Sequence, residues 1–157
     1  MAKVIIGFGS NLGDRRKNIN KAFRFLSQQE TKIIKVSSLL ESEPAEGVSG
    51  GSFINGAALI ETELETEALL RLLQNVEERI GRPRPHSSKD ARLIDLDIIY
   101  YEDRVVNKKT LKIPHPRRLE RWFVMEPAAE AAPNFRDPVL KKSLIVIASE
   151  VQRGNPT

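Results

Sequence analysis

The sequence predicts an α+β domain in which helices pack on one mainly antiparallel sheet. Short runs rich in apolar and β-branched residues alternate with longer segments whose apolar residues recur at helical spacing. Clusters of Gly, Pro, Asn and Asp separate these segments and are typical of turns. With 157 residues, 40% hydrophobic and 29% charged, the chain has the size and composition of one globular unit. We therefore expect a single domain over residues 1–157.

Composition narrows the classes of function. The net charge is +4 and the pI is near 9.5, a mild basic excess that suits either a nucleic-acid binder or a protein for a multiply anionic small ligand. Basic residues are spread along the chain, which favours the small ligand. The lack of cysteine excludes a disulfide framework and a Cys-ligated metal. No apolar run approaches the roughly 18 residues of a membrane span, and the start lacks a signal-peptide pattern, so we expect a cytoplasmic protein.

The first 62 residues predict three strands and one helix. Residues 4–9 indicate a buried strand that ends in a turn at 10–14. The turn sequence matches neither the Walker motif nor the dinucleotide-binding motif, the two common phosphate-binding patterns. A turn that caps the helix after it is favoured over a phosphate cradle. Residues 31–40 and 53–62 predict the next strands. The loop between them, residues 41–52, contains Pro and three Gly and is long for a hairpin, which is typical of functional loops.

The second half alternates in the same way. Residues 65–80 predict an amphipathic helix that Gly81 closes. A polar loop at 83–90 leads into a strand at 92–101, and a turn at 102–103 predicts a hairpin with 105–106. Pro114 and Pro116 exclude a regular helix start before Pro116. Residues 127–132 and 143–151 predict the last helices.

The strand at 92–101 is the centre of the chemistry. Alternation directs Ile94, Leu96, Ile98 and Tyr100 to one face, into a core, and directs Asp95 and Asp97 to the other. The two Asp Cα atoms would lie about 7 Å apart at roughly 3.3 Å per residue.

Neighbouring carboxylates repel each other, so a cation is expected between them. That cation is a basic side chain or a divalent metal, and hard oxygen ligands favour Mg²⁺. Arg82, Arg84 and Arg92 lie just upstream. The pattern therefore suggests a site for a polyphosphate chelated to Mg²⁺.

Other candidate residues are ambiguous on their own. Phe53 and Asn55 share a face at the mouth of the loop. They are equally well explained as a core Phe with a turn-forming Asn, or as a stacking aromatic beside an amide that reads a heterocycle edge. Gln74 and Glu77 are typical of a solvated helix edge, and His115 of surface decoration.

Six short motifs occur in order along nearly the whole chain and together resemble the 6-hydroxymethyl-7,8-dihydropterin pyrophosphokinase family of folate biosynthesis. They are Gly9-Ser10-Asn11-Leu12-Gly13, Phe53-x-Asn55, Gly81-Arg82-x-Arg84, Arg92-x-x-Asp95-Leu96-Asp97-Ile98, Pro114-His115 and Arg121-x-Phe123. The resemblance implies a ferredoxin-like fold and an ATP-dependent transferase. In that reaction the pterin hydroxymethyl oxygen attacks the β-phosphorus of ATP, and AMP leaves.

The resemblance also assigns roles to residues. It implies that Asp95 and Asp97 hold two Mg²⁺ ions and that ATP is the co-substrate. The triphosphate of the nucleotide would be held by Arg82, Arg92 and His115, with assistance from Arg84 and Arg121. The nucleotide would also be faced by Gln74 and Glu77. The pterin would be bound by Phe53 and Phe123 as stacking rings, by Asn55 at the ring edge, and by backbone groups around residues 43–46, including Glu43 and Pro44. Asp97 is also a hypothetical acceptor for the hydroxyl proton.

The chain departs from the family pattern at two places. Lys89 replaces a loop tryptophan, which puts the packing of a closing loop in question, and Ser42-Glu43-Pro44 replaces Thr-Pro-Pro. The expected partners are the pterin and ATP alone, with no nucleic acid, no membrane and a monomeric state. The alternatives are an RNA-binding ferredoxin-like module and a catalytically inactive pterin or nucleotide binder of the same fold. The Asp pair disfavours both, because it would repel RNA phosphates and has no physical purpose in an inactive protein.

Overall fold

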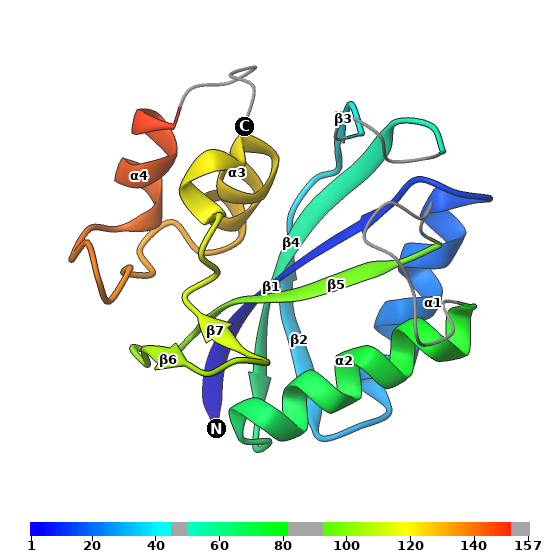
Figure 1. The fold of residues 1–157 in the computed structure, drawn as a ribbon, viewed down its shortest axis with the longest axis horizontal. Helices are drawn as coiled ribbons and strands as arrows, with labels where there is room; N and C mark the ends of the chain where they lie inside the picture. Colours follow the sequence, from blue (N-terminus) through cyan, green and yellow to red (C-terminus); the bar gives the residue numbers. More distant parts are fainter. Residues whose placement is uncertain (45–49, 82–92, 152–157) are drawn as a thin grey trace.

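The computed structural model describes residues 1–44, 50–81 and 93–151. It shows a five-stranded antiparallel sheet in the order β2-β4-β1-β5, in which β3 pairs with β4 farther along the same edge as β2, and helices cover both faces (Figure 1). The predicted α+β class with a mainly antiparallel sheet is confirmed. The predictions for Arg82, Arg84, Lys89 and Arg92 lie outside the described residues.

The elements alternate as the sequence predicts. The strands of the main sheet are β1 (Ala2–Ser10), β2 (Thr31–Val36), β3 (Leu40–Ser42), β4 (Phe53–Thr62) and β5 (Asp95–Tyr101), and a separate ribbon consists of β6 (Val106–Asn107) and β7 (Lys112–Ile113). The helices are α1 (Arg15–Ser27), α2 (Thr66–Ile80), α3 (Trp122–Ala131) and α4 (Leu144–Glu150), with a 3-10 turn, η1 (Arg118–Glu120), before α3. None of these helices is long and apolar enough to cross a membrane.

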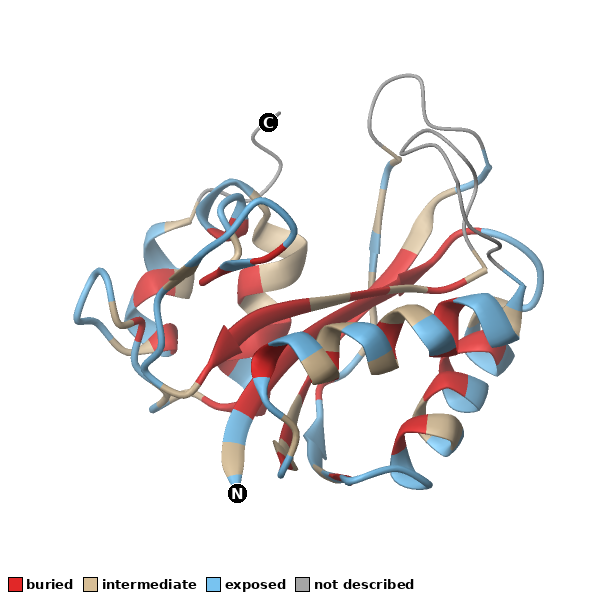
Figure 2. Cartoon of the chain, turned by 60° about the horizontal axis from the view of Figure 1, so that its bottom comes forward, coloured by how far each residue is buried: buried red, intermediate tan, exposed pale blue. Residues whose placement is uncertain are grey.

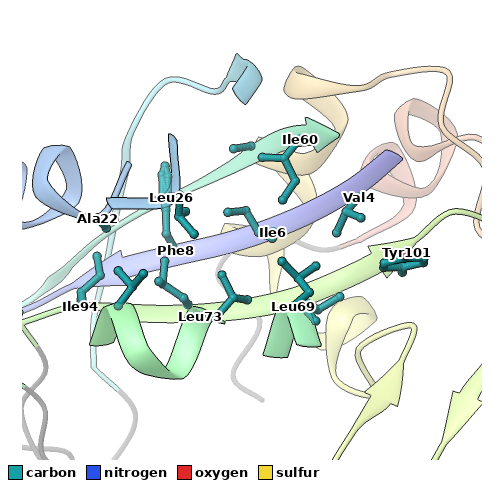
Figure 3. Packing of buried hydrophobic residues seen from close by; sticks show 14 of the residues in the cluster. Val4, Ile6, Phe8, Ala22, Leu26, Ile60, Leu69, Leu73, Ile94 and Tyr101 are labelled. Carbon is teal, nitrogen blue, oxygen red and sulfur yellow. The ribbon is translucent and has the colours of Figure 1, made fainter. Parts of the chain in front are cut away.

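The central strand β1 is buried on both faces, which explains its nearly unbroken apolar run (Figure 2). Val4, Ile6 and Phe8 point into a core that α1 and α2 cover (Figure 3). Ile5 points the other way, into a second core that α3 and α4 cover. The sheet is therefore the middle layer of three.

Local chemistry sets the helix ends as predicted. Asp14 is the N-cap of α1, where its carboxylate accepts the backbone N–H of Lys17 at 3.1 Å. Gly81 ends α2 with φ 129°, a conformation that favours glycine. A Cβ there would also lie 2.7 Å from Leu93 Cδ1, so this side chain would have to shift.

The predicted strand at 31–40 is interrupted. Val36 pairs with Ala58 and Leu40 with Asn55, so residues 37–39 oppose only two residues of β4. The Ser37 N–H donates to the Ala57 carbonyl at 2.9 Å, and the Ser37 hydroxyl accepts the Ala57 N–H at 2.9 Å. A side-chain oxygen thus replaces a backbone carbonyl, and one strand becomes β2 and β3.

Two further predictions in the second half are wrong. The hairpin predicted after residues 102–103 does not form with β5, because β6 pairs instead with β7. Tyr100 does not share the face of Ile98. The register moves from Ile6 opposite Ile98 to Ile5 opposite Tyr100, so β5 carries one extra residue, a β-bulge. Tyr100 consequently packs in the second core and Tyr101 in the first.

Candidate active site

Three strands bring the polar residues of the predicted site into two rows. Asn55, Gly9 and Asp95 lie side by side on β4, β1 and β5, and Asp97 lies beside Gly7 in the next row. Residues directly opposite each other on neighbouring strands share a face. Asp95, Asp97 and Asn55 therefore lie on one face of the sheet, the face that α3 and α4 cover farther along the strands.

Glycine forms the floor between the acidic and the amide residues. A Cβ at Gly9 would lie 3.1 Å from Asn55 Oδ1 and 3.4 Å from Phe53 Cδ1, so both side chains lie over this glycine. Phe53 and Asn55 therefore share a face, as their spacing predicted. Gly7 and Gly9 were not predicted as site residues, although two glycines at alternate positions of a strand indicate close approach of a ligand or a side chain.

Asn55 is held in one orientation. Its Nδ2 donates to Ser42 Oγ at 2.7 Å and to the Leu40 carbonyl at 3.3 Å, and the residue is 7% exposed. Both amide protons are therefore used by β3. The oxygen Oδ1 is left as an acceptor over Gly9, on the face that carries the two aspartates.

The turn after β1 and the first residue of α1 hold both ends of the predicted pterin loop in place. The Arg15 guanidinium donates to the Ser52 carbonyl at 2.9 Å and pairs with Glu41 at 3.6 Å. Asn11 Nδ2 donates to the Gly51 carbonyl at 3.3 Å. Between these anchors, Glu43 is exposed and Pro44 is half-buried. The Arg15 contacts could not be predicted from the sequence, because their partners lie far along the chain.

The backbone of His115 is hydrogen-bonded to the edge strand β5, which carries Asp95 and Asp97. Its backbone N–H donates to the Ile99 carbonyl at 2.9 Å, and its Nδ1 accepts the Arg117 N–H at 3.2 Å. In the neutral ring Nε2 therefore carries the proton. Burial, followed by the positive charge of Arg121, lowers the pKa of His115 from 6.5 to about 4, and the negative charge of Asp95 opposes the shift. The ring is a neutral hydrogen-bond donor at pH 7.

The start of α3 adds a cation and aromatic rings. Arg121 is the N-cap residue of α3, and Phe123 lies in its first turn. The half-buried Phe123 packs edge-on against Trp122, with ring centroids 5.9 Å apart. Because α3 packs on β4, Phe123 lies on the same side of the sheet as Phe53. The stacking of a ligand between the two Phe rings stays a prediction.

Glu77 differs from its expected solvated state. It is 5% exposed, and its Oε2 accepts the Leu96 N–H at 2.8 Å, between the two aspartates of β5. The carboxylate therefore reaches from α2 to the strand that carries Asp95 and Asp97. Gln74 is half-buried one turn earlier. The nucleotide contacts predicted for both residues stay predictions.

The carboxylates of Asp95 and Asp97 are of the donor type that magnesium prefers. Mg²⁺ binds hard oxygens and commonly uses one or two carboxylates together with substrate phosphates and water. Asp95 and Asp97 supply two such carboxylates on a rigid strand. Within the part of the chain that the structure describes, no group of three His, Cys, Asp or Glu residues is placed to hold a metal ion. Two carboxylates match the donor type that Mg²⁺ uses when phosphates and water supply its other ligands.

These features define an α+β domain with an acidic pair and an amide on one sheet face, His115 at the edge strand, and Arg121 near the His115 ring. A family model described as 7,8-dihydro-6-hydroxymethylpterin-pyrophosphokinase (HPPK) matches residues 5–133. The chain belongs to this family, which confirms the resemblance seen in the sequence.

Similar proteins agree with this assignment. A 2-amino-4-hydroxy-6-hydroxymethyldihydropteridine pyrophosphokinase of Aquifex aeolicus is 37% identical over 144 residues, which covers 92% of this chain and 89% of that protein. The folic acid synthesis protein fol1 of Pneumocystis carinii is 39% identical over 90% of this chain, and the match spans only 19% of that longer protein. A crystal structure of Plasmodium falciparum HPPK-DHPS with pteroate superposes with a TM-score of 0.74 over 95% of this chain and 44% of that one, at 13% identity. This last likeness shows the fold.

Proposed function

We propose that the chain transfers pyrophosphate from ATP to the hydroxymethyl group of 6-hydroxymethyl-7,8-dihydropterin and releases AMP. The observation that carries this proposal is the row of Asn55, Gly9 and Asp95 across three strands. It joins an acceptor for a heterocycle, an open floor and a carboxylate on one rigid surface. The family and the names of its members support the same reaction.

The spacing of the row suits a flat bicyclic substrate. Neighbouring strands lie about 4.8 Å apart, so Asn55 and Asp95, two strands apart, are separated by roughly 10 Å at the backbone. A pterin lying over Gly9 would donate a ring N–H to Asn55 Oδ1 and extend its hydroxymethyl arm toward the aspartates. Stacking on Phe53 and Phe123 would add about 0.5–1.5 kcal/mol for each aromatic pair.

The other end of the row would hold the triphosphate. Asp95 and Asp97 would bind two Mg²⁺ ions, which when bound neutralise phosphate charge and align the reacting oxygens. His115 would donate from Nε2 to a phosphate oxygen, and Arg121 would supply a positive charge. As the hydroxymethyl oxygen bonds to the β-phosphorus, the bond from that phosphorus to the α,β-bridging oxygen breaks, and AMP carries this oxygen away. Our candidate acceptor for the hydroxyl proton is the Asp97 carboxylate.

We further propose that residues 1–157 act as one pyrophosphokinase domain. The two hydrophobic cores share β1, and the family model matches residues 5–133, which include most residues of both cores. The chain spans only about a fifth of the length of the longer folic acid synthesis proteins that it matches, and 89% of the Aquifex protein. The monomeric state and the independence of nucleic acid stay predictions.

The deciding experiment is product analysis. The protein is incubated with Mg²⁺, ATP and the hydroxymethyl pterin, and nucleotides are separated by ion-exchange chromatography. AMP should form in equal amount to the pterin pyrophosphate, and omission of Mg²⁺ should abolish both. Release of ADP would overturn the proposed reaction. Saturable pterin binding without AMP would favour the inactive binder, and salt-dependent RNA affinity without pterin binding would favour the RNA module.

A further inference from the structure

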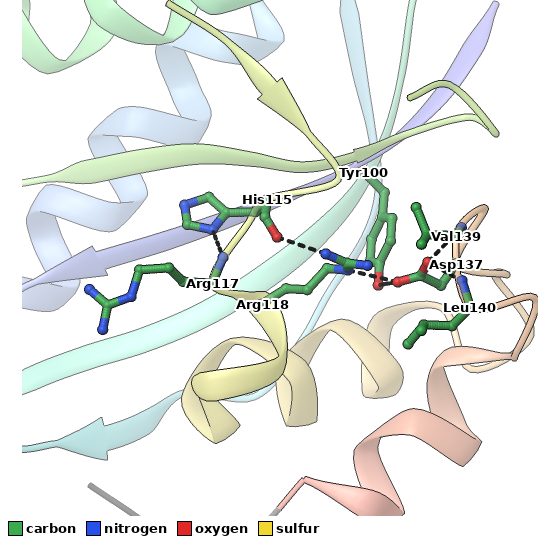
Figure 4. A network of polar contacts seen from close by, with 7 residues as sticks. All are labelled: Tyr100, His115, Arg117, Arg118, Asp137, Val139 and Leu140. Atoms are coloured by element: carbon green, nitrogen blue, oxygen red, sulfur yellow. Dashed lines mark hydrogen bonds and ion pairs between the residues drawn. The ribbon is translucent and has the colours of Figure 1, made fainter. Parts of the chain in front are cut away.

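Behind His115 lies a buried ion pair that the proposed reaction does not use. Arg118 Nε and Asp137 Oδ2 are 2.7 Å apart, and their side chains are 9% and 0% exposed (Figure 4). The Tyr100 hydroxyl donates to the same oxygen at 2.7 Å. The N–H groups of Val139 and Leu140 donate to the other oxygen, Oδ1, at 2.8 and 2.9 Å. The carboxylate is thus saturated by donors from three parts of the chain.

The same guanidinium reaches the backbone of His115. Arg118 Nη1 donates to the His115 carbonyl at 3.1 Å, and the Arg118 N–H donates to it at 3.2 Å. With the His115 N–H bonded to the Ile99 carbonyl, both backbone polar groups of His115 are held. The planar guanidinium therefore joins a fixed buried carboxylate to the peptide from which the imidazole projects.

Stability alone is a weak reason for this arrangement. Replacing a buried ion pair by uncharged side chains of similar volume is often neutral or stabilising, because desolvation of two charges offsets their attraction. What the pair supplies is a fixed direction, since a guanidinium bonded at both edges has little freedom to move. An imidazole that donates to a transferring phosphate needs such placement, because an error of about 1 Å can cost two orders of magnitude in rate.

We propose that Arg118 and Asp137 are positioning residues that orient the His115 imidazole toward the triphosphate. This inference rests on the proposed function, which assigns His115 to the nucleotide. It extends the site to the segment before α4, about twenty residues beyond His115 in sequence.

The test is the double variant Arg118→Met/Asp137→Asn. Loss of one partner alone would leave a buried charge unpaired and could unfold the protein, whereas the double variant removes both charges together. The introduced amide can still accept the Val139 and Leu140 N–H groups through its oxygen and donate to the Tyr100 oxygen. The melting temperature should therefore stay within about 5 °C of wild type, using roughly 2–4 °C per kcal/mol for a chain of this size.

Two readouts separate positioning from a general loss of structure. The KM for ATP should rise about tenfold while the KM for the pterin stays unchanged, because only the nucleotide end loses a placed donor. The His115 ring resonances should shift in NMR spectra of the free protein. Glu150→Gln is the matched control, because it removes the exposed Lys142–Glu150 pair of the same segment, 3.1 Å long, without touching His115.

The outcomes are decisive in each case. A folded double variant with unchanged KM for ATP, or with equal rises for both substrates, would overturn the proposal. If the double variant does not fold, Arg118→Lys is used, since one ammonium can pair with Asp137 but cannot span to the His115 carbonyl, and the same KM split is expected. If wild-type protein forms no AMP, the proposed function fails, while the NMR shift still decides whether the pair positions His115.

Discussion

Gly9 of β1 and Gly56 of β4 lie on opposite faces of the sheet, so a substitution at each position tests one face separately. Gly9 lies on the face of the aspartates, and Gly56 lies on the face covered by α1 and α2, opposite Phe8. Neither has positive φ, so alanine is compatible with the backbone at both positions. Gly9→Ala should impair pterin binding with little change in stability, whereas Gly56→Ala should lower stability.

The distances set the sizes of the effects. At Gly56 a Cβ would lie 2.3 Å from Phe8 Cζ. This is about 1.2 Å short of the roughly 3.5 Å contact distance between carbons, so the ring must move. Phe8 is 5% exposed and packs edge-on against Phe23, which leaves it little room. Overpacking of this kind costs about 1–3 kcal/mol and should lower the melting temperature by about 2–12 °C.

At Gly9 the nearest atom would be Asn55 Oδ1 at 3.1 Å, so a tilt of a few tenths of an ångström relieves the contact. Alanine loses less backbone freedom on folding than glycine does, which stabilises the strand by about 0.5–1 kcal/mol and should offset the crowding. The tilt, however, moves the acceptor that the pterin ring needs, and the methyl group raises the floor. We expect a rise of about tenfold in the KM for the pterin, equivalent to one lost hydrogen bond of about 1.4 kcal/mol.

The assays are thermal unfolding by circular dichroism and AMP formation at varied pterin and varied ATP. Each variant is the control for the other, because both add one methyl group to a neighbouring strand of the same sheet. A wild-type KM for the pterin in Gly9→Ala would refute the role of this glycine as the floor of the site. An unchanged melting temperature in Gly56→Ala would refute the packing argument on the opposite face.

Three further predictions concern Asp95, Asp97 and the residues predicted to act with them. Asp95→Ala or Asp97→Ala should abolish AMP formation and leave the melting temperature unchanged or higher, because a like-charge repulsion is removed; an active variant would exclude the metal assignment. Phe123→Ala should weaken pterin binding far more than ATP binding in calorimetry, and equal losses would contradict stacking. The His115 pKa, followed by NMR, should lie near 4 and should rise in Arg121→Ala, since that positive charge opposes protonation. Between pH 4 and 6.5 the unfolded chain binds more protons at His115, so stability should increase with pH across this window, and a midpoint above 6 would be contrary evidence.

The elements that could be predicted from the sequence are those that local periodicity specifies. The strand Phe53–Thr62 and the helix Thr66–Ile80 agree with prediction at nearly every residue, because one has a clear start after a Gly-rich loop and the other ends at a glycine with positive φ. The strand predicted at 31–40 was wrong at residues 37–39, because the Ser37 hydroxyl accepts the Ala57 N–H. No periodicity reports such a bond, since its partner is twenty residues away.

The site was predictable only as far as its residues belong to motifs. Alternation placed Asp95 and Asp97 on one face without any tertiary information. Asp137 could not be found in this way, because its partners Arg118 and Tyr100 meet it only after α3 and the following loop have folded over the sheet. The burial of Glu77 was missed for the same reason. An isolated helix shows this carboxylate at the edge of an apolar stripe, and only the packing of α2 on β5 supplies its N–H donor.

The β-bulge in β5 explains how one sheet face combines a core with an active site. On this face Ile99 and Tyr100 belong to the apolar core under α3 and α4, while Asp97 and Asp95 lie beyond its edge. The bulge places two successive apolar residues, Ile99 and Tyr100, in the same core, which anchors the strand immediately after the acidic positions. The same face of β1 changes in the same way, from the large buried side chain of Ile5 to Gly7 and Gly9, which carry no side chain. The packing of the apolar half under α3 and α4 thus fixes the strands on which Asp95, Asp97 and the two glycines lie.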